Sequence, residues 1–410
     1  MTIRIKFADG TVHARDWIER GGDEAQALLR RNKETYPLCL CTRAGVPMCI
    51  RAMRSTGKHY LARMPGTGPS HAVSCPSYEV IHGKAEADAI EDGSIVMLPD
   101  GRVMFKLDVG FGIRDNAAVP GVRPDPSVLP QAVQQPPARL GLFALLQVMW
   151  EQAELHHWHP KMAGKRHYGL VYRLLMDVAE HLIVKGFPLS YRLFMPEPFH
   201  RKRAEEIHLK RLERLSHLSR GSHGERRRFL VLGQIRRAKG NTDAVRLWLS
   251  HLGDDLKIQV ATSMWERICK RWDVKLDQET QEGVHVWGLF LIDEIQGGIM
   301  LSRAGAILQT TTHFIPTFRL PEVGLAYGLV DSGRRFIKRL VLDGRPVQSE
   351  PAFVLTDTAE PFPLYIVEQG IPDAGSSEAE WYWHTDRQAM WPPLPMPRRA
   401  VEARRVRVNQ

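Results

Sequence analysis

The sequence contains no apolar run long enough to cross a membrane. A helix that spans a bilayer needs about 18 or more consecutive apolar residues, and the 410 residues include no such stretch. Residues 1–17 alternate apolar and polar side chains, which is typical of a β-strand, and they lack the apolar segment of a secretory signal. We therefore expect a cytoplasmic protein that does not contact a membrane.

Cysteine is also scarce, with five residues in the whole chain. An odd, small number in a chain of this length does not make a disulfide framework. Four of the five (Cys39, Cys41, Cys49 and Cys75) nevertheless fall close together, and Cys269 stands apart. In a reducing compartment such clustering indicates a metal site and not disulfide bonds.

Nucleotide-binding loops and internal repeats are missing as well. The run Gly66-Thr67-Gly68 has neither a further glycine downstream nor the Gly-Lys-Ser/Thr that holds phosphates. It predicts only a turn. Positive charge, by contrast, is in excess, because 56 Lys and Arg face 46 Asp and Glu, a net charge of +10. This balance favours a polyanionic partner through counterion release.

The chain is too long for one ordinary core, so two or three domains are expected. Strand and turn patterns at the start, helical spacing in the middle and alternating patterns later predict an α+β fold. Residues 94–110 predict a β-hairpin around Pro99-Asp100-Gly101. The predicted division is a β-rich, zinc-binding domain at 1–112, a proline-rich linker at 113–138, a helical domain at 139–199, a mixed region at 200–392 and a basic, proline-rich tail at 393–410.

Cys39-Leu40-Cys41 is followed by His71 and Cys75, which are four residues apart. Zinc prefers four soft or borderline ligands in a tetrahedron, and three thiolates with one imidazole meet that preference. Four protein ligands leave no open position, so we expect a structural zinc ion. The spacing differs from the common ribbon with two Cys-x-x-Cys knuckles, and reduced cysteines without metal remain an alternative.

Two other side chains compete for a place in this site. Cys49 lies in the apolar run Met48-Cys49-Ile50, which suits a small core thiol, and His82 follows Cys75 closely. Farther along, His156, His157 and His159 surround Trp158, but their spacing does not put three imidazoles on one helix face. We expect a histidine-rich helix end there.

The runs YPLCLCTRAGVPMCI and HYLARMPGTGPSHAVSCPSYE resemble the N-terminal signature of domain-of-unknown-function family 1173. The resemblance extends to WHPKMAGKR, to RLFMPEPF and to FIKRLVLDG with PAFVLTDT, so it covers nearly the whole chain. The resemblance implies a protein of bacterial plasmids and integrative elements. It implies no particular chemistry.

Residues 315–392 resemble a PD-(D/E)xK nuclease core of the restriction-endonuclease-like type. The resemblance implies an acid on a leading helix, an Asp at the start of one strand and Glu-x-Lys on the next, which together hold a divalent cation and activate water. Glu322 would be the helix acid, but Ala352 stands where the Asp is expected. Tyr365 and Val367 stand where the Glu and Lys are expected. Such side chains do not bind magnesium.

Asp357 and Glu368 lie near those positions, at the ends of their predicted strands. If they had taken over the lost roles, the chain would be a metal-dependent nuclease with Glu322, Asp357 and Glu368 as its acids. We expect surface carboxylates at both positions and no catalytic residue.

Candidate nucleic-acid contacts lie in two basic segments. Lys165 and Arg166 follow Gly164 between two helices, where they could touch phosphate or simply form a polar loop. A second segment has few acids to balance it and holds Arg226, Arg227, Arg228, Arg236 and Arg237. The charged run before it, at 200–214, contains acids at helical spacing and predicts a solvated helix.

These observations favour a non-catalytic, zinc-stabilised protein of a bacterial mobile element that associates with nucleic acid with little sequence preference. The metal-dependent nuclease is one alternative. The other is a scaffold that binds protein partners from the same element through its basic surfaces.

Overall fold

The computed structural model describes residues 3–53, 56–64, 66–80, 84–98, 102–111, 140–220, 227–270, 283–342, 350–367, 380–385 and 399. These residues form an α+β fold with four sheets. The predicted linker at 113–138 and the tail at 393–410, apart from Arg399, lie outside the described residues. Among the described helices, none combines the length and the apolar character needed to span a bilayer.

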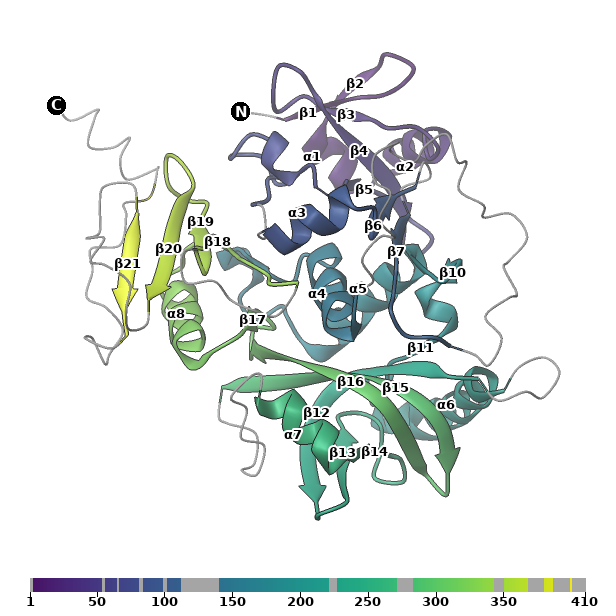
Figure 1. Ribbon diagram of the computed structural model, residues 1–410. Helices are drawn as coiled ribbons and strands as arrows, with labels where there is room; N and C mark the ends of the chain where they lie inside the picture. The colour runs from purple at the N-terminus through teal and green to yellow at the C-terminus, as the bar shows by residue number, and fades with distance from the viewer. Residues whose placement is uncertain are drawn as a thin grey trace.

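Figure 1 shows how the parts are arranged. The N-terminal sheet lies at the top, helices α4 and α5 occupy the centre, a large curved sheet lies at the bottom, and the C-terminal sheet stands at the left beside α8. Helix α3 lies between the N-terminal sheet and the central helices.

The N-terminal sheet has the order β2-β1-β3-β4-β5. Residues 1–17 were predicted as one strand, but the described part, residues 3–17, forms a hairpin and the start of a helix, because the chain turns at Gly10, whose φ is +83°. Ile5, Phe7 and Leu29 pack in its core with Cys39 and Cys75. The elements are β1 (Arg4–Lys6), β2 (Val12–Ala14), α1 (Arg15–Arg20), α2 (Asp23–Arg31), β3 (Leu38–Cys39), β4 (Val46–Ala52), β5 (His59–Arg63) and the 3-10 helix η1 (Gly68–Ser70).

The predicted hairpin at 94–110 is confirmed, since β6 (Ile95–Met97) pairs with β7 (Val103–Phe105). It does not join the N-terminal sheet, however. Strand β7 pairs with β9 in a second sheet of order β10-β9-β7-β6, and its side chains pack against α4 and α5 in the largest core. The hairpin therefore packs in the largest core, whereas the strands of the N-terminal sheet pack in a separate one. The other elements here are α3 (Lys84–Glu91), α4 (Leu142–Gln152), α5 (Tyr168–His181), β9 (Leu182–Val184), β10 (Phe187–Pro188), η4 (Leu189–Tyr191) and β11 (Leu193–Phe194).

The large sheet closes on itself as a five-stranded barrel. The sheet has seven strands, and the closed ring within it has the order β12-β13-β14-β16-β15, with β15 paired back to β12; β11 lies parallel beside β12, and a short strand after the barrel pairs with β16. Every pair in this ring is antiparallel except β14 with β16, and α7 connects the third strand to the fourth. This connectivity is that of the OB fold, a small Greek-key barrel. The elements are β12 (Phe229–Gly240), β13 (Ala244–Leu249), β14 (Lys257–Ala261), α7 (Thr262–Lys270), β15 (Val284–Gln296) and β16 (Ile299–Thr311); η5 (Arg201–Arg203) and α6 (Ala204–Ser219) precede the barrel and β17 (Pro316–Thr317) follows it.

Two features of the sequence allow the barrel to close. The pairing of β12 passes from β15 to β13 at Ile235, with an irregularity before Arg237 that bends the strand. Gly288 and Gly305 leave room for the ring of Phe290, because a Cβ atom at these positions would lie 2.2 Å and 2.6 Å from ring carbons. The barrel interior is thus filled by side chains.

The C-terminal sheet has the order β21-β20-β19-β18-β8, and only β20 and β21 are parallel. Its edge strand β8 comes from residues far earlier in the chain, just after α4. The elements are β8 (His157–Trp158), η3 (Pro160–Met162), α8 (Leu320–Asp331), β18 (Phe336–Lys338), β19 (Phe353–Leu355), β20 (Phe362–Val367) and β21 (Trp381–His384).

Candidate metal centre and basic face

Two short segments bring four potential metal ligands together. Cys39 ends β3 and Cys41 follows it, while His71 and Cys75 lie in the loop after η1. This loop packs closely on itself, since a Cβ atom at Gly68 would lie 2.1 Å from Cβ of Glu79. Glycine at position 68 therefore allows the loop to fold back under the β3 turn.

The side chains converge as the spacing predicts. Sγ of Cys39 lies 3.8 Å from Sγ of Cys75, and Nδ1 of His71 lies 3.3 Å from Sγ of Cys41 and 3.6 Å from Sγ of Cys75. All four donor atoms lie within 4.8 Å of one another. Three thiols and one imidazole at these distances could bind one metal ion.

The surroundings favour one thiolate at this cluster, that of Cys75, whereas burial raises the pKa of Cys41. The hydrogen bond from Cys39, with contributions from His71, from the Ser77 amide and from Arg15, lowers the pKa of Cys75 to about 4. The hydrogen bond with Cys75 raises the pKa of Cys39, because the first thiolate opposes the second in the absence of a cation. A bound cation would remove that opposition. The Cys75 thiolate is therefore stabilised by neighbouring hydrogen-bond donors and by Arg15 even without a metal ion.

Arg15 is a contributor that the sequence did not reveal. Its guanidinium donates to Sγ of Cys75 at 3.7 Å and to Oγ of Ser77 at 2.8 Å. It comes from α1, which lies sixty residues earlier, so no local pattern could indicate the contact. Cys49, a competing candidate, is buried in the core and donates to the carbonyl of Ala62, outside the cluster. His82 lies outside the described residues.

The sequence model of one family, described as protein of unknown function (DUF1173), matches residues 14–392. The chain belongs to the DUF1173 family. No curated protein and no solved structure gives a significant match. The predicted family is therefore confirmed.

In the DUF1173 chain, the acids proposed for a nuclease centre are occupied by internal contacts. Glu322 is 1% exposed; its carboxylate accepts from the amide of Phe318 at 2.7 Å and pairs with Lys338 at 3.3 Å and Arg319 at 3.5 Å. Asp357 pairs with Arg334 at 2.7 Å. Glu368 lies outside the described residues.

The positions expected to carry the remaining nuclease residues lie side by side. Ala352 immediately precedes β19, and its amide donates to the carbonyl of Leu364, next to Tyr365 in β20. The ring of Tyr365 stacks on Tyr382 at 4.7 Å. Lys338, which the sequence pattern did not single out, is 1% exposed and lies over the ring of Phe318. Burial lowers the pKa of Lys338 to about 8.

Arg166 is placed as a structural side chain. Its guanidinium donates to the carbonyl oxygens of Leu155 at 2.8 Å, His313 at 3.2 Å and Glu154 at 3.5 Å, and also to that of His157. Burial lowers its pKa to about 10. These contacts leave little of the Arg166 guanidinium for a phosphate. Its neighbour Lys165 is exposed.

The second predicted basic segment is partly balanced by acids that are distant in sequence. Arg228 pairs with Asp293 at 2.6 Å, and Arg236 pairs with Asp254. Arg227 is half-buried, and Arg226 lies outside the described residues. Arg237 is exposed and lies 4.0 Å above the ring of Trp248. Arg237 is thus exposed on the barrel without an acidic partner among the described residues.

Arg237 belongs to a larger group that we call the basic face. Residues that alternate along a strand, or lie directly opposite on the next strand, share one face of a sheet. Arg237 is opposite Trp248, Lys239 is opposite Arg246, and Arg246 is opposite Gln259. Lys257 shares the face through Gln259. The basic face therefore consists of Arg237, Lys239, Arg246 and Lys257 on β12, β13 and β14.

Within the described residues, Lys239, Arg246 and Lys257 form no ion pair with an acid. Arg237, Lys239 and Arg246 are exposed, and Lys257 is half-buried. The alternation of Arg237 and Lys239 in the sequence of β12 could have indicated part of this face. The register that places the two strands together could not be foreseen.

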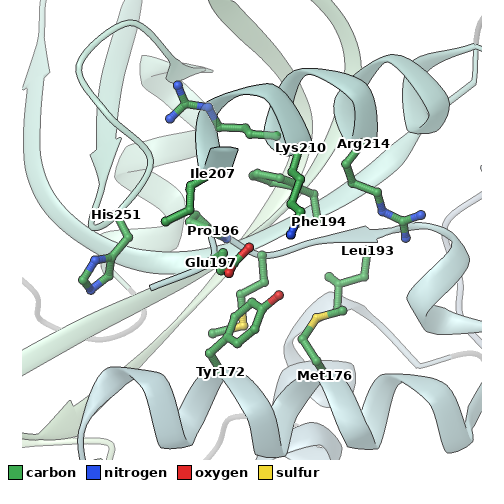
Figure 2. Close-up of a pocket in the computed structure, with 12 residues that line it drawn as sticks. Tyr172, Met176, Leu193, Phe194, Pro196, Glu197, Ile207, Lys210, Arg214 and His251 are labelled. Carbon is green, nitrogen blue, oxygen red and sulfur yellow. The ribbon is translucent and has the colours of Figure 1, made fainter. Parts of the chain in front are cut away.

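A small pocket of about 260 Å³ lies between α5, the end of β11 and α6. Figure 2 shows Tyr172 and Met176 rising from one helix and Lys210 reaching down from the other, with Glu197 between them. Its cations contact this chain: Lys210 pairs with Glu206 at 2.6 Å, Arg211 with Asp255 at 3.0 Å, and Arg214 donates to a carbonyl. Within the predicted helix at 200–214, Glu206 pairs with Arg203 and Lys210 as expected, whereas Arg211 and Arg214 contact residues outside it.

Proposed function

We propose that this DUF1173 protein binds single-stranded nucleic acid on the basic face of its barrel, with little sequence preference and without cleaving it. The observation that carries the proposal is the position of the basic face on the first three strands of an OB-type barrel. In OB folds, the face of the second and third strands, flanked by two loops, takes up oligonucleotides.

The charges and the aromatic ring on this face suit such a ligand. Lys239 and Arg246 are exposed and face each other across β12 and β13, so both can contact phosphates along one strand of nucleic acid. The guanidinium of Arg237 lies over the ring of Trp248, with Cζ 4.0 Å from the ring centroid. A flat guanidinium offers a stacking platform to any base, which gives affinity without sequence preference.

The metal cluster and the C-terminal core complete the proposal. Zinc fits the set of three cysteines and one histidine because the ion favours tetrahedral sulfur and nitrogen ligands, and four protein ligands make it structural. The C-terminal sheet, with its leading helix α8 and with Ala352 and Tyr365 in the expected places, supports a nuclease-like core that has lost its acids. The mobile-element context and a cytoplasmic location remain expectations from the sequence.

The test measures binding of the full chain to labelled single-stranded DNA, single-stranded RNA and duplex DNA. Fluorescence anisotropy of the label reports binding at several salt concentrations. Affinity for single strands should exceed affinity for duplex and should fall steeply with salt. Lys239→Glu with Arg246→Glu should weaken binding more than tenfold for all sequences, and the logarithmic salt slope should decrease by about 1–2.

A matched control is Arg203→Glu with Lys210→Glu on α6, which makes the same change in charge at residues paired with Glu206. It should bind nearly as the wild type does. No binding by the wild type at low salt, or an equal loss in both variants, would contradict the proposal and favour a protein-binding scaffold. We do not advance the nuclease alternative, because the described candidate acids are held in internal ion pairs.

A further inference from the structure

A second group of potential metal ligands lies apart from the cysteine cluster. Oε2 of Glu79 lies 2.7 Å from Nε2 of His156 and 2.5 Å from Nε2 of His157. The three donor atoms lie within 4.8 Å of one another. Glu79 and His156 are 2% and 0% exposed, and the side chain of His157 is 16% exposed.

The three side chains come from opposite sides of a junction in the fold. Glu79 follows the loop of His71 and Cys75, whereas His156 and His157 follow α4 and lead into β8, the edge strand of the C-terminal sheet. The backbone on the histidine side is fixed, since the amide of Lys338 donates to the carbonyl of His156. Closely packed elements therefore hold the donors in place, as a preformed site requires.

We propose that Glu79, His156 and His157 bind a second divalent transition-metal ion, with zinc the ion that the donors suit best. Two imidazoles and one carboxylate form a donor set of three-ligand zinc sites, which keep a further position open to water. In the protein, both Nε2 atoms point at a single carboxylate oxygen. A cation could bind all three donor atoms if the carboxylate oxygen and the two Nε2 atoms moved apart to about 3 Å. This is the separation between donor atoms that metal–ligand bonds of about 2 Å require.

The guanidinium of Arg63 is the main objection, because it lies 3.4 Å from the same oxygen of Glu79. Arg63 also faces a second carboxylate, that of Glu151, at 3.3 Å. It can stay paired with Glu151 while Glu79 turns to the metal. Two carboxylates around one guanidinium leave negative charge that a cation would balance.

The surroundings also bring solvent close to this place. Arg63 and Glu151 line a pocket of about 490 Å³ between the N-terminal sheet and α4. Arg63 therefore lies between this pocket and Glu79, and water from the pocket could fill the open coordination position of the metal.

The experiment measures metal content of the purified full chain after dialysis against zinc and then against metal-free buffer. Wild type should hold two ions per chain, and Glu79→Gln should hold one. His159→Gln is the matched control, because His159 is a neighbouring histidine that caps η3 and is not a proposed ligand. This variant should still bind two ions. One ion in the wild type, or two in Glu79→Gln, would overturn the proposal.

Cobalt substitution separates this site from the cysteine cluster. Only the cysteine site can give thiolate-to-cobalt charge transfer, so Glu79→Gln should keep that absorption and the visible bands of the cysteine site, and lose only the visible absorption that the second cobalt ion adds. If Glu79→Gln fails to fold, His157→Gln takes its place, and the wild-type content still decides. The result does not depend on nucleic-acid binding.

Discussion

Nε2 of His156 lies 2.7 Å from Oε2 of Glu79, a residue that precedes it by 77 positions. The contact joins the loop of the cysteine cluster to the strand that edges the C-terminal sheet. His157 reaches the same oxygen, and Arg63 approaches it from β5. The carboxylate of Glu79 therefore accepts from side chains of two parts of the fold, so a substitution at Glu79 should disturb the packing of both parts.

The cysteine cluster should make stability depend on metal. Cys39→Ser with Cys41→Ser should lose one metal ion per chain and lower the melting temperature by several degrees, because metal binding contributes folding free energy. Cys49→Ser is the control, since Cys49 is a buried thiol outside the cluster and should retain full metal content. Elemental analysis and thermal unfolding with and without chelator give the answer. Equal metal content in both proteins would exclude the site.

Arg166 should matter for stability and not for nucleic-acid binding. Arg166→Gln leaves several buried carbonyl oxygens without donors, and we expect the free energy of unfolding to fall by about 2–4 kcal/mol. Lys165→Gln, at the exposed neighbour, should change it by less than about 0.5 kcal/mol. Urea unfolding measures both. A stable Arg166→Gln protein that binds DNA weakly would restore Arg166 as a contact residue.

Lys338 should make stability rise with pH in the alkaline range. Its pKa in the folded protein is about 8, below the usual 10.5, so between these values the unfolded chain holds a proton that the folded chain lacks. Stability then increases with pH through this window. Lys338→Met should abolish the increase and, at neutral pH, destabilise by about 3–5 kcal/mol because Glu322 loses its buried partner. Lys161→Met, at an exposed residue, should keep the increase; if Lys338→Met keeps it too, another group is responsible.

Purified protein should not cut DNA in magnesium or manganese. Ala352 has no ligand atom, and the phenol of Tyr365 stays neutral because burial raises its pKa further. Plasmid and single-stranded substrates, followed on gels, test this directly. Cleavage that persists through purification and disappears in Asp357→Ala or Glu368→Ala would show that the acids had moved, and the protein would then be an enzyme.

Local patterns in the sequence were sufficient for several features. The ligand pairs Cys39 with Cys41 and His71 with Cys75 are each only a few residues apart, so their spacing alone indicated a shared metal site. The hairpin of β6 and β7 and the internally paired helix α6 also follow from neighbouring residues. In each of these features, most of the residues that contact one another are close together in the sequence.

The barrel, the Glu79 cluster and the state of each arginine were decided only by the tertiary structure. Strand β12 pairs with β15, more than fifty residues later, and that pairing closes the ring and sets which side chains share its outer face. Asp254 and Asp293 neutralise Arg236 and Arg228 from 18 and 65 residues away. Such contacts depend on strand register and on the packing of distant segments. Neither can be deduced from residues that are neighbours in the sequence, so arginines that the fold buries, pairs or exposes could not be told apart before the structure.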